Sequence, residues 1–312
     1  MNRWDAGDCA HYFSEIFVGV TTITTFTLHI LLPTTLDYHE LSKHSYQSLP
    51  SDETPLCTII IKTTTSTNAE ELTSFQSIML NYLNALNLIG YVVNVFFTFF
   101  STLIFDIKGP GELSDKYQTI ITPTGFIFSI WGVIFIFQGI FTVVQMLKDF
   151  RAVDLVRSHS SGVSYWYFIT CIAQSAWTIL FGKEMILQST IAMLIILYSL
   201  VQFVQNQSSQ TNKSAKEIWL LTFPFQIHCG WIFCATMLNI NVMAISMGAE
   251  GFFQTFLALI SLGFLGVQAY LYLGLALGLF PPRHSPPTHV AVLTIPSVFA
   301  WATVHSSICA FL

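Results

Sequence analysis

Long runs of apolar residues alternate with short polar segments along most of this chain of 312 residues. The hydrocarbon core of a bilayer is about 30 Å thick, and a helix needs roughly 20 apolar residues to cross it. Backbone polar groups in lipid must pair within their own segment, so each run is predicted to be a helix. The pattern predicts seven membrane-spanning helices, at residues 78–106, 124–147, 164–182, 185–205, 218–247, 252–280 and 290–312.

The composition agrees with this pattern, because 53% of the residues are hydrophobic and only 9% are charged. Soluble domains carry about 25% charged residues, so most of this surface cannot face water. The expected fold class is therefore an all-α, multi-pass integral membrane protein whose main partner is the lipid bilayer. No basic patch indicates a nucleic-acid partner. The six Cys are scattered without a CxxC pair and indicate neither a metal site nor a disulfide framework.

The first 73 residues differ from the rest, so we expect an N-terminal extension at 1–73 and a membrane domain at 74–312. A Thr-rich apolar stretch at 13–32 is long enough to cross a bilayer. It is an eighth span, a targeting segment or an interfacial helix, and the sequence does not choose among these. Residues 34–73 are polar and rich in Ser and Thr, which is typical of a flexible segment.

Charged side chains are missing from the middle of the predicted spans. Ion-coupled carriers usually place ionisable groups there, so that class is disfavoured. We predict no catalytic residue and no metal ligand, and the chain is not expected to be an enzyme. His228 in the fifth span is interpreted as a packing residue in preference to a haem or metal ligand. The amides of Asn84, Asn87 and Asn94 share a helix face, where they bond to other helices or line a cavity.

Three predicted helices each present an indole, and two of them add an amide on the same face. Helical spacing of three or four residues places such side chains one above another. A flat, largely apolar ligand could be held there by ring stacking and one or two hydrogen bonds. The alternatives are aromatic core packing and interfacial belts. The candidate ligand-binding residues are Trp131 and Phe135 in the second span, Gln174 and Trp177 in the third, and Trp231, Ala235 and Asn239 in the fifth.

These motifs resemble those of the tryptophan-rich sensory protein/translocator protein (TspO/MBR) family, and more closely its larger members with extra C-terminal helices. The second-helix motif reads Pro123, Trp131 and Phe135; the third reads Gln174, Trp177, Phe181 and Gly182; the fifth reads Trp231, Ala235, Thr236 and Asn239. The resemblance covers about residues 78–245. It implies a five-helix core at about 78–247 and extra helices at about 252–280 and 290–312.

The chain departs from the family pattern at several of these positions. Gln174 stands where the family has Asn, and Phe135 and Phe225 stand where it often has Tyr. Pro224 precedes Trp231 by seven residues, whereas the family proline lies one turn before the indole. The resemblance therefore implies the fold more directly than it implies the ligand.

In function, the resemblance implies a protein that binds, and transports or senses, a hydrophobic ligand in a cavity between helices. The ligand implied is a tetrapyrrole such as protoporphyrin, or a sterol, and a homodimer is implied as a further partner. Two alternatives stay open: a structural or regulatory bundle that acts through protein partners, and a porphyrin-degrading enzyme. The sequence does not identify the membrane, and an organellar one is a candidate.

Overall fold

The computed structural model describes residues 82–123, 125–147, 150, 154–158, 162–208, 210, 213–276, 294–300 and 302, which all belong to one unit of the chain, Glu70–Leu312. The predictions for the extension 1–73, including its stretch 13–32, lie outside these residues. So does much of the last predicted span, 290–312, of which the structure describes a helix at 294–300.

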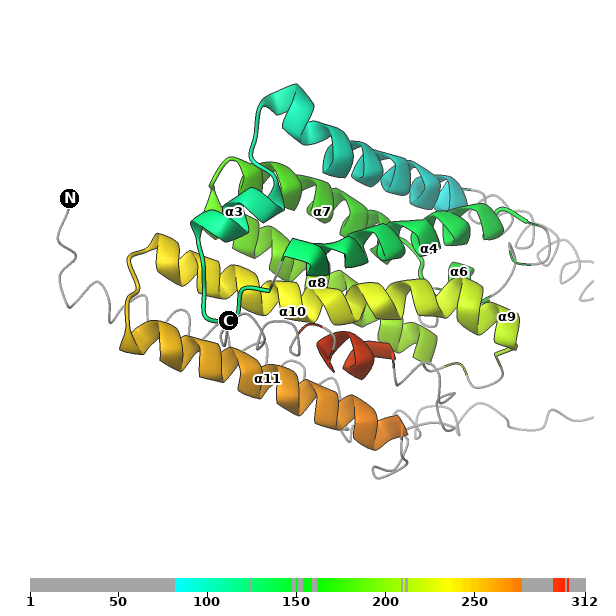
Figure 1. Ribbon diagram of the computed structural model, residues 1–312. Coiled ribbons are helices and arrows are strands. Elements are labelled where there is room, and N and C mark those ends of the chain that lie inside the picture. The colour runs from blue at the N-terminus through cyan, green and yellow to red at the C-terminus, as the bar shows by residue number, and fades with distance from the viewer. Residues whose placement is uncertain are drawn as a thin grey trace, which may run out of the picture. The chain divides into compact units, whose positions relative to one another are not determined.

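The described residues form helices joined by turns and loops, with no strand among them (Figure 1). In chain order the helices are Tyr82–Phe105 (cyan and unlabelled in Figure 1), α3 Pro110–Lys116, η1 Gly125–Ser129, α4 Ile130–Val144, α6 Asp154–Arg157, α7 Trp166–Gly182, α8 Ile186–Ser208, α9 Ala215–Glu217, η2 Ile218–Thr222, α10 Phe223–Ser246, α11 Phe252–Ala276 and 294–300 (red).

Within the described residues, five segments are long and apolar enough to cross a bilayer: Tyr82–Phe105, Gly125–Val144, Ile186–Ser208, Ala215–Ser246 and Phe252–Gly274. With 17 residues, α7 lies at the lower end of the length that a span requires. The predicted all-α membrane fold is confirmed. Where both are described, predicted and observed helix ends differ by at most three residues, which is ordinary for helix boundaries. The short helices α3 and α6 lie in segments that the sequence pattern assigns to connectors.

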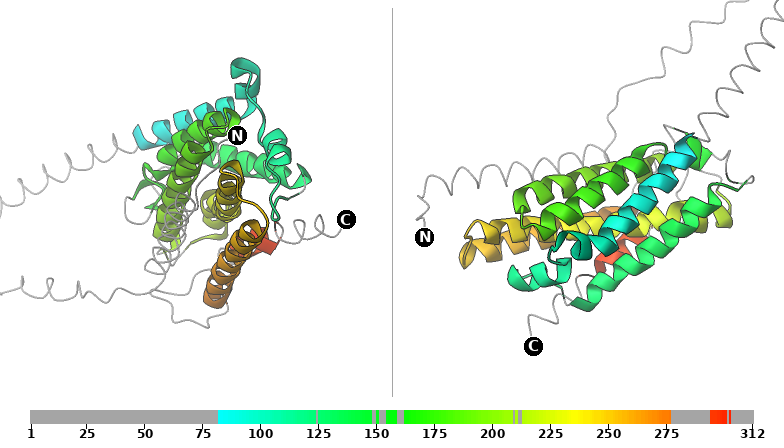
Figure 2. Two further views of the ribbon diagram at one scale, coloured as in Figure 1. Left: turned by 90° about the vertical axis from the view of Figure 1, so that its left-hand side faces the viewer. Right: turned by 90° about the horizontal axis from the view of Figure 1, so that it is seen from above.

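The central helix of the bundle is α10, which packs against α8, α4 and α11. Seen nearly end-on in the left panel of Figure 2, α10 is surrounded by these neighbours. Its buried residues occur all around the helix, whereas Tyr82–Phe105 buries few of its side chains. A helix that is apolar all round belongs in the interior, and α10 therefore positions side chains of the candidate site.

An irregular turn precedes α10. Pro224 has no amide hydrogen and cannot donate to a carbonyl one turn earlier. The chain makes a wider turn there, because the N–H of Phe223 donates to the carbonyl of Ile218, five residues back. This π-helical turn, η2, lets α9 and α10 continue as one span over Ala215–Ser246 in spite of the proline.

Glycines allow two close approaches between helices. A Cβ atom on Gly139 of α4 would lie 2.7 Å from the hydroxyl of Tyr91, which donates to the carbonyl of Phe135 at 2.9 Å. A Cβ atom on Gly230 of α10 would lie 3.1 Å from Cβ of Val298 and 3.3 Å from Cα of Ile295. Helix 294–300 therefore packs directly on the backbone of α10, and in Figure 1 it lies between α10 and α11.

The contact at Gly230 gives a test of the position of helix 294–300. Gly230→Leu places a side chain where Val298 and Ile295 lie, and we expect it to lower the free energy of unfolding by about 1–3 kcal/mol. Gly263→Leu is the matched control, because a Cβ at Gly263 in α11 meets no atom within 4 Å. Thermal unfolding of the two variants in detergent should separate them. Equal stabilities would contradict the described packing.

Candidate functional site

Indole rings from α4, α7 and α10 meet inside the bundle. The ring centroid of Trp131 lies 6.5 Å from that of Trp177 and 6.1 Å from that of Trp231. The three rings border one cavity of about 30 Å³, which has room for one or two water molecules. Its lining comprises Pro110, Ser114, Phe128, Trp131, Trp177, Phe181, Met193, Trp231, Ala235, Leu238, Asn239 and Val242. We call this the aromatic cavity.

Asn239 fixes one of these indoles through a buried hydrogen-bond chain. The Trp177 Nε1–H donates to Asn239 Oδ1 at 2.9 Å. Asn239 Nδ2 in turn donates to Thr190 Oγ1 at 2.7 Å and to Ser189 Oγ at 3.4 Å, both on α8. Buried polar groups are expensive to leave unpaired, so this chain holds α7, α8 and α10 in one arrangement. The indole and amide stripes identified in the sequence therefore face each other.

The structure brings five of the seven predicted site residues to the cavity and leaves two beside it. Trp131, Trp177, Trp231, Ala235 and Asn239 are in the lining. Phe135 stacks on Trp131, with centroids 5.9 Å apart, but does not border the cavity. Gln174 is buried outside the lining, and its Oε1 has no hydrogen-bond partner within the described part of the chain. The binding roles of all seven residues stay predictions.

Sequence reasoning missed other members of the lining. Phe181 was available from the Phe-Gly end of the third-helix motif, and Phe128 from the aromatic run before Trp131. Pro110 and Ser114 come from α3, inside a segment that reads as a polar connector. No periodicity in that segment indicates that it borders the cavity.

His228 lies against the cluster and takes part in a second polar chain. Gln138 Nε2 lies 2.7 Å from His228 Nδ1, and the Tyr167 hydroxyl donates to Gln138 Oε1 at 3.3 Å. Since the hydroxyl of Tyr167 orients the amide, Gln138 donates to Nδ1 and the imidazole proton belongs on Nε2. The ring meets Trp131 edge-on at 5.7 Å. His228 is thus hydrogen-bonded at Nδ1, whereas its Nε2 is buried with no partner among the described residues, and its interpretation as a packing residue stays a prediction.

The structure also shows what two of the three amides on the first helix contact. Asn84 Nδ2 donates to the Gln145 carbonyl and Asn87 Nδ2 to Gln145 Oε1, each at 3.1 Å, and Gln145 Nε2 donates back to the Asn84 carbonyl at 3.3 Å. These bonds join Tyr82–Phe105 to the end of α4. Of the two interpretations, interhelical bonding holds for these two amides.

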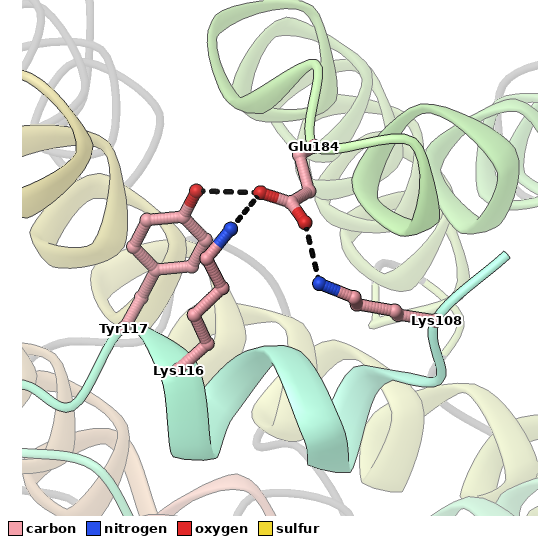
Figure 3. A network of polar contacts seen from close by, with 4 residues as sticks. All are labelled: Lys108, Lys116, Tyr117 and Glu184. Atoms are coloured by element: carbon pink, nitrogen blue, oxygen red, sulfur yellow. Dashed lines mark hydrogen bonds and ion pairs between the residues drawn. The ribbon is translucent and has the colours of Figure 1, made fainter.

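A carboxylate outside the spans holds α3 over the cavity (Figure 3). Glu184, in the turn between α7 and α8, accepts from Lys108 Nζ at 2.9 Å, from the Tyr117 hydroxyl at 2.8 Å and from Lys116 Nζ. We call these four residues the Glu184 latch. Glu184 has a left-handed backbone with φ of 59°, which is uncommon for a residue with a side chain.

The latch is electrostatic in character. The ammonium of Lys116, then that of Lys108, and the Tyr117 hydroxyl lower the pKa of Glu184 to about 2. The same carboxylate raises the pKa of Lys116. The latch side chains are partly exposed, so solvent screens the attraction and each pair is weak by itself. Pro110 and Ser114 of α3 line the cavity and Leu113 is fully buried, so the latch adds an electrostatic contribution to the apolar packing that holds α3 as a cover.

Taken together, the fold and the site define a multi-pass helical membrane protein with the aromatic cavity inside its bundle. A family model described as TSPO-like protein matches residues 84–305, and the chain belongs to this TSPO-like family. The resemblance inferred from the three motifs is confirmed. The match also includes α11 and helix 294–300, which the five-helix resemblance leaves without counterparts. No curated protein and no solved structure matches this chain.

The Glu184 latch predicts a pH dependence of the cover. A carboxylate whose pKa falls from 4.5 unfolded to about 2 folded contributes stability above about pH 4.5, and loses it as the pH falls toward 2. Hydrogen exchange of peptides covering Pro110–Lys116, compared at matched pH, should be severalfold faster in Glu184→Gln than in wild type near neutral pH. The difference should shrink below about pH 4.5. Glu250→Gln, on an exposed turn, is the control and should match wild type. A difference that is independent of pH would refute the latch.

Proposed function

We infer that this protein binds a flat, hydrophobic ring system at the aromatic cavity, with a tetrapyrrole such as protoporphyrin as the first ligand class and a sterol as the second. The carrying observation is the convergence of Trp131, Trp177 and Trp231 on one cavity. Indole faces stack on flat rings, and three of them from three helices can hold a ring on more than one side. Membership of the TSPO-like family supports the same proposal.

The polar groups of the cavity suit recognition better than acid–base catalysis. Among the described lining residues, Ser114 and Asn239 supply the hydroxyl and the amide, and Trp231 lines the cavity with an Nε1–H that has no hydrogen-bond partner within the described residues. A buried donor of this kind can pair with a ligand carboxylate, hydroxyl or ring nitrogen. The lining offers no carboxylate or imidazole to move a proton. We therefore place binding, with transport or sensing, ahead of porphyrin breakdown.

Binding requires the cavity to enlarge. Pockets for ligands of this size have volumes of about 300–1,000 Å³, far above the 30 Å³ present here. We place this movement at α3, because it is a short helix whose Glu184 latch is partly exposed and consists of weak pairs, and Leu113 is its one fully buried apolar side chain. On this proposal, α3 moves away and the indoles of Trp131 and Trp231 turn to stack on the ligand. Trp177 keeps its orientation through Asn239.

The proposal is tested by removing two indoles while keeping aromatic packing. Trp131→Phe combined with Trp231→Phe should weaken protoporphyrin binding at least tenfold, since two stacking contacts worth about 0.5–1.5 kcal/mol each are reduced and the free Nε1–H is lost. The measurement is a titration followed by the porphyrin absorbance, so that loss of tryptophan emission does not interfere.

The matched control is Trp166→Phe in α7. Trp166 packs on Tyr165 and Tyr198, with centroids 5.1 and 5.8 Å away, and does not line the aromatic cavity. It should bind porphyrin as wild type does. If the double variant binds as tightly as wild type, the site is elsewhere. If a sterol displaces porphyrin from wild type, both ligand classes share the cavity. The homodimer implied by the resemblance is a separate prediction.

A further inference from the structure

A second, larger hollow lies on another side of α4 and α10. It has a volume of about 610 Å³ and shares no lining residue with the aromatic cavity. Its lining comprises Phe126, Ser129, Ile130, Val133, Trp219, Phe223, Ile227, Thr294, Ser297 and Val298. We call it the lateral groove. Because Phe128 and Trp131 line the aromatic cavity, the start of the second span separates the two spaces.

Helix 294–300 forms the third wall of the lateral groove. It is held against α10 at Gly230, where Val298 and Ile295 approach the backbone, and by Phe299, whose ring meets Phe233 edge-on at 5.8 Å. The groove is thus built from the second and fifth spans together with the C-terminal helix. The five-helix core alone would not form it.

The lateral groove is elongated along the helices that line it. It extends along the second span from Phe126 to Val133, a separation of seven residues, and along the η2–α10 segment from Trp219 to Ile227, a separation of eight. At 1.5 Å per residue these are about 10 and 12 Å. The two spans are antiparallel, because Phe137 pairs with Phe223 whereas Trp131 pairs with Trp231. The two lined segments therefore follow one another, and the path is roughly 20 Å long.

A length of roughly 20 Å and a volume of about 610 Å³ describe an elongated hollow that is open on one side. An extended hydrocarbon chain matches this elongated shape. The lined face passes from one helix to the other halfway along. A flexible hydrocarbon chain can follow such a face by rotation about its single bonds.

The surroundings of the groove indicate where such a chain comes from. Both lined segments belong to membrane spans, so the groove lies at the depth of the hydrocarbon core. Its rim is open to lipid, since Phe126 is 65% exposed, Val133 42% and Trp219 49%. The described lining carries aromatic and aliphatic side chains with hydroxyls and no charge. The bilayer itself therefore supplies the occupant.

One end of the groove is suited to a headgroup. Trp219 is exposed there, and Lys216, three residues earlier and also exposed, lies on the adjoining turn. Residues three apart on a helix are neighbours on its surface. Indoles favour the membrane–water interface, and a lysine next to it attracts a phosphate. This charge complementarity favours a phospholipid over a neutral lipid.

We propose that the lateral groove binds one acyl chain of a bilayer phospholipid, whose phosphate lies near Lys216 and Trp219. The bound chain fills the space between the second span, α10 and helix 294–300 and makes dispersion contacts with all three. It is a site for a resident lipid and is independent of the ligand proposed for the aromatic cavity.

The test fills the groove and measures retained lipid. Val133→Trp and Ile227→Trp each place an indole in the groove, and Val143→Trp is the matched control, an exposed position on α4 outside the lining. Native mass spectrometry of full-length protein extracted in mild detergent should find one phospholipid per chain in wild type and Val143→Trp. Each groove variant should show at least fivefold lower occupancy. Unchanged occupancy in the groove variants overturns the proposal, as does retention of a sterol or a free fatty acid instead.

A second measurement on wild-type protein covers the case in which a groove variant does not fold. A phospholipid with a photoreactive group midway along one acyl chain is crosslinked in vesicles, and the labelled peptides are mapped. Labelling concentrated at residues 126–133 and 219–227 supports the site, and even labelling of exposed positions such as Ile191 of α8 overturns it. Trp131→Phe with Trp231→Phe should retain the lipid, so failure of porphyrin binding and failure of this proposal are distinguishable.

Discussion

Polar side chains inside a bilayer have no water to pair with, and this constraint organises the whole bundle. The amide of Asn239 meets it by pairing with an indole on α7 and hydroxyls on α8, and Gln138 meets it by pairing with an imidazole on α10 and a phenol on α7. Gln145 does the same for the first helix. Each pairing joins helices that are distant in sequence, so satisfying the polar groups also fixes which helices are neighbours. The aromatic cavity is what remains between the helices so joined.

The two hollows differ in kind although α4 and α10 line both. The aromatic cavity is small and bordered by indoles, one of which is fixed by an amide. The lateral groove is large, open to lipid and apolar along its length. Two consecutive residues of α4 line different hollows, because Ile130 borders the lateral groove and Trp131 borders the aromatic cavity. The two spaces are thus separated by the thickness of one helix.

Much of the fold and part of the site could be predicted from the sequence. Hydropathy locates the helices because crossing a bilayer requires an unbroken apolar run, and the spacing of Trp231, Ala235 and Asn239 gives a shared face. The position of α3 could not be predicted, since its seven residues are held by Glu184, a partner 68 residues from Lys116. Nor could the groove, which depends on Gly230 bringing helix 294–300 against α10. Such contacts between distant segments leave no periodic signal.

The Glu184 latch lies outside the membrane spans, whereas the aromatic cavity beneath α3 lies within the bundle. Mobile ions shorten the reach of charges at the surface to about 8 Å at physiological ionic strength, but they hardly act on pairs buried among helices. Added salt would therefore loosen the cover without disturbing the indole–amide chain below it. The strength of the Glu184 latch therefore depends on the ionic strength of the water, whereas the hydrogen bonds beside the aromatic cavity depend on the apolar surroundings inside the bundle.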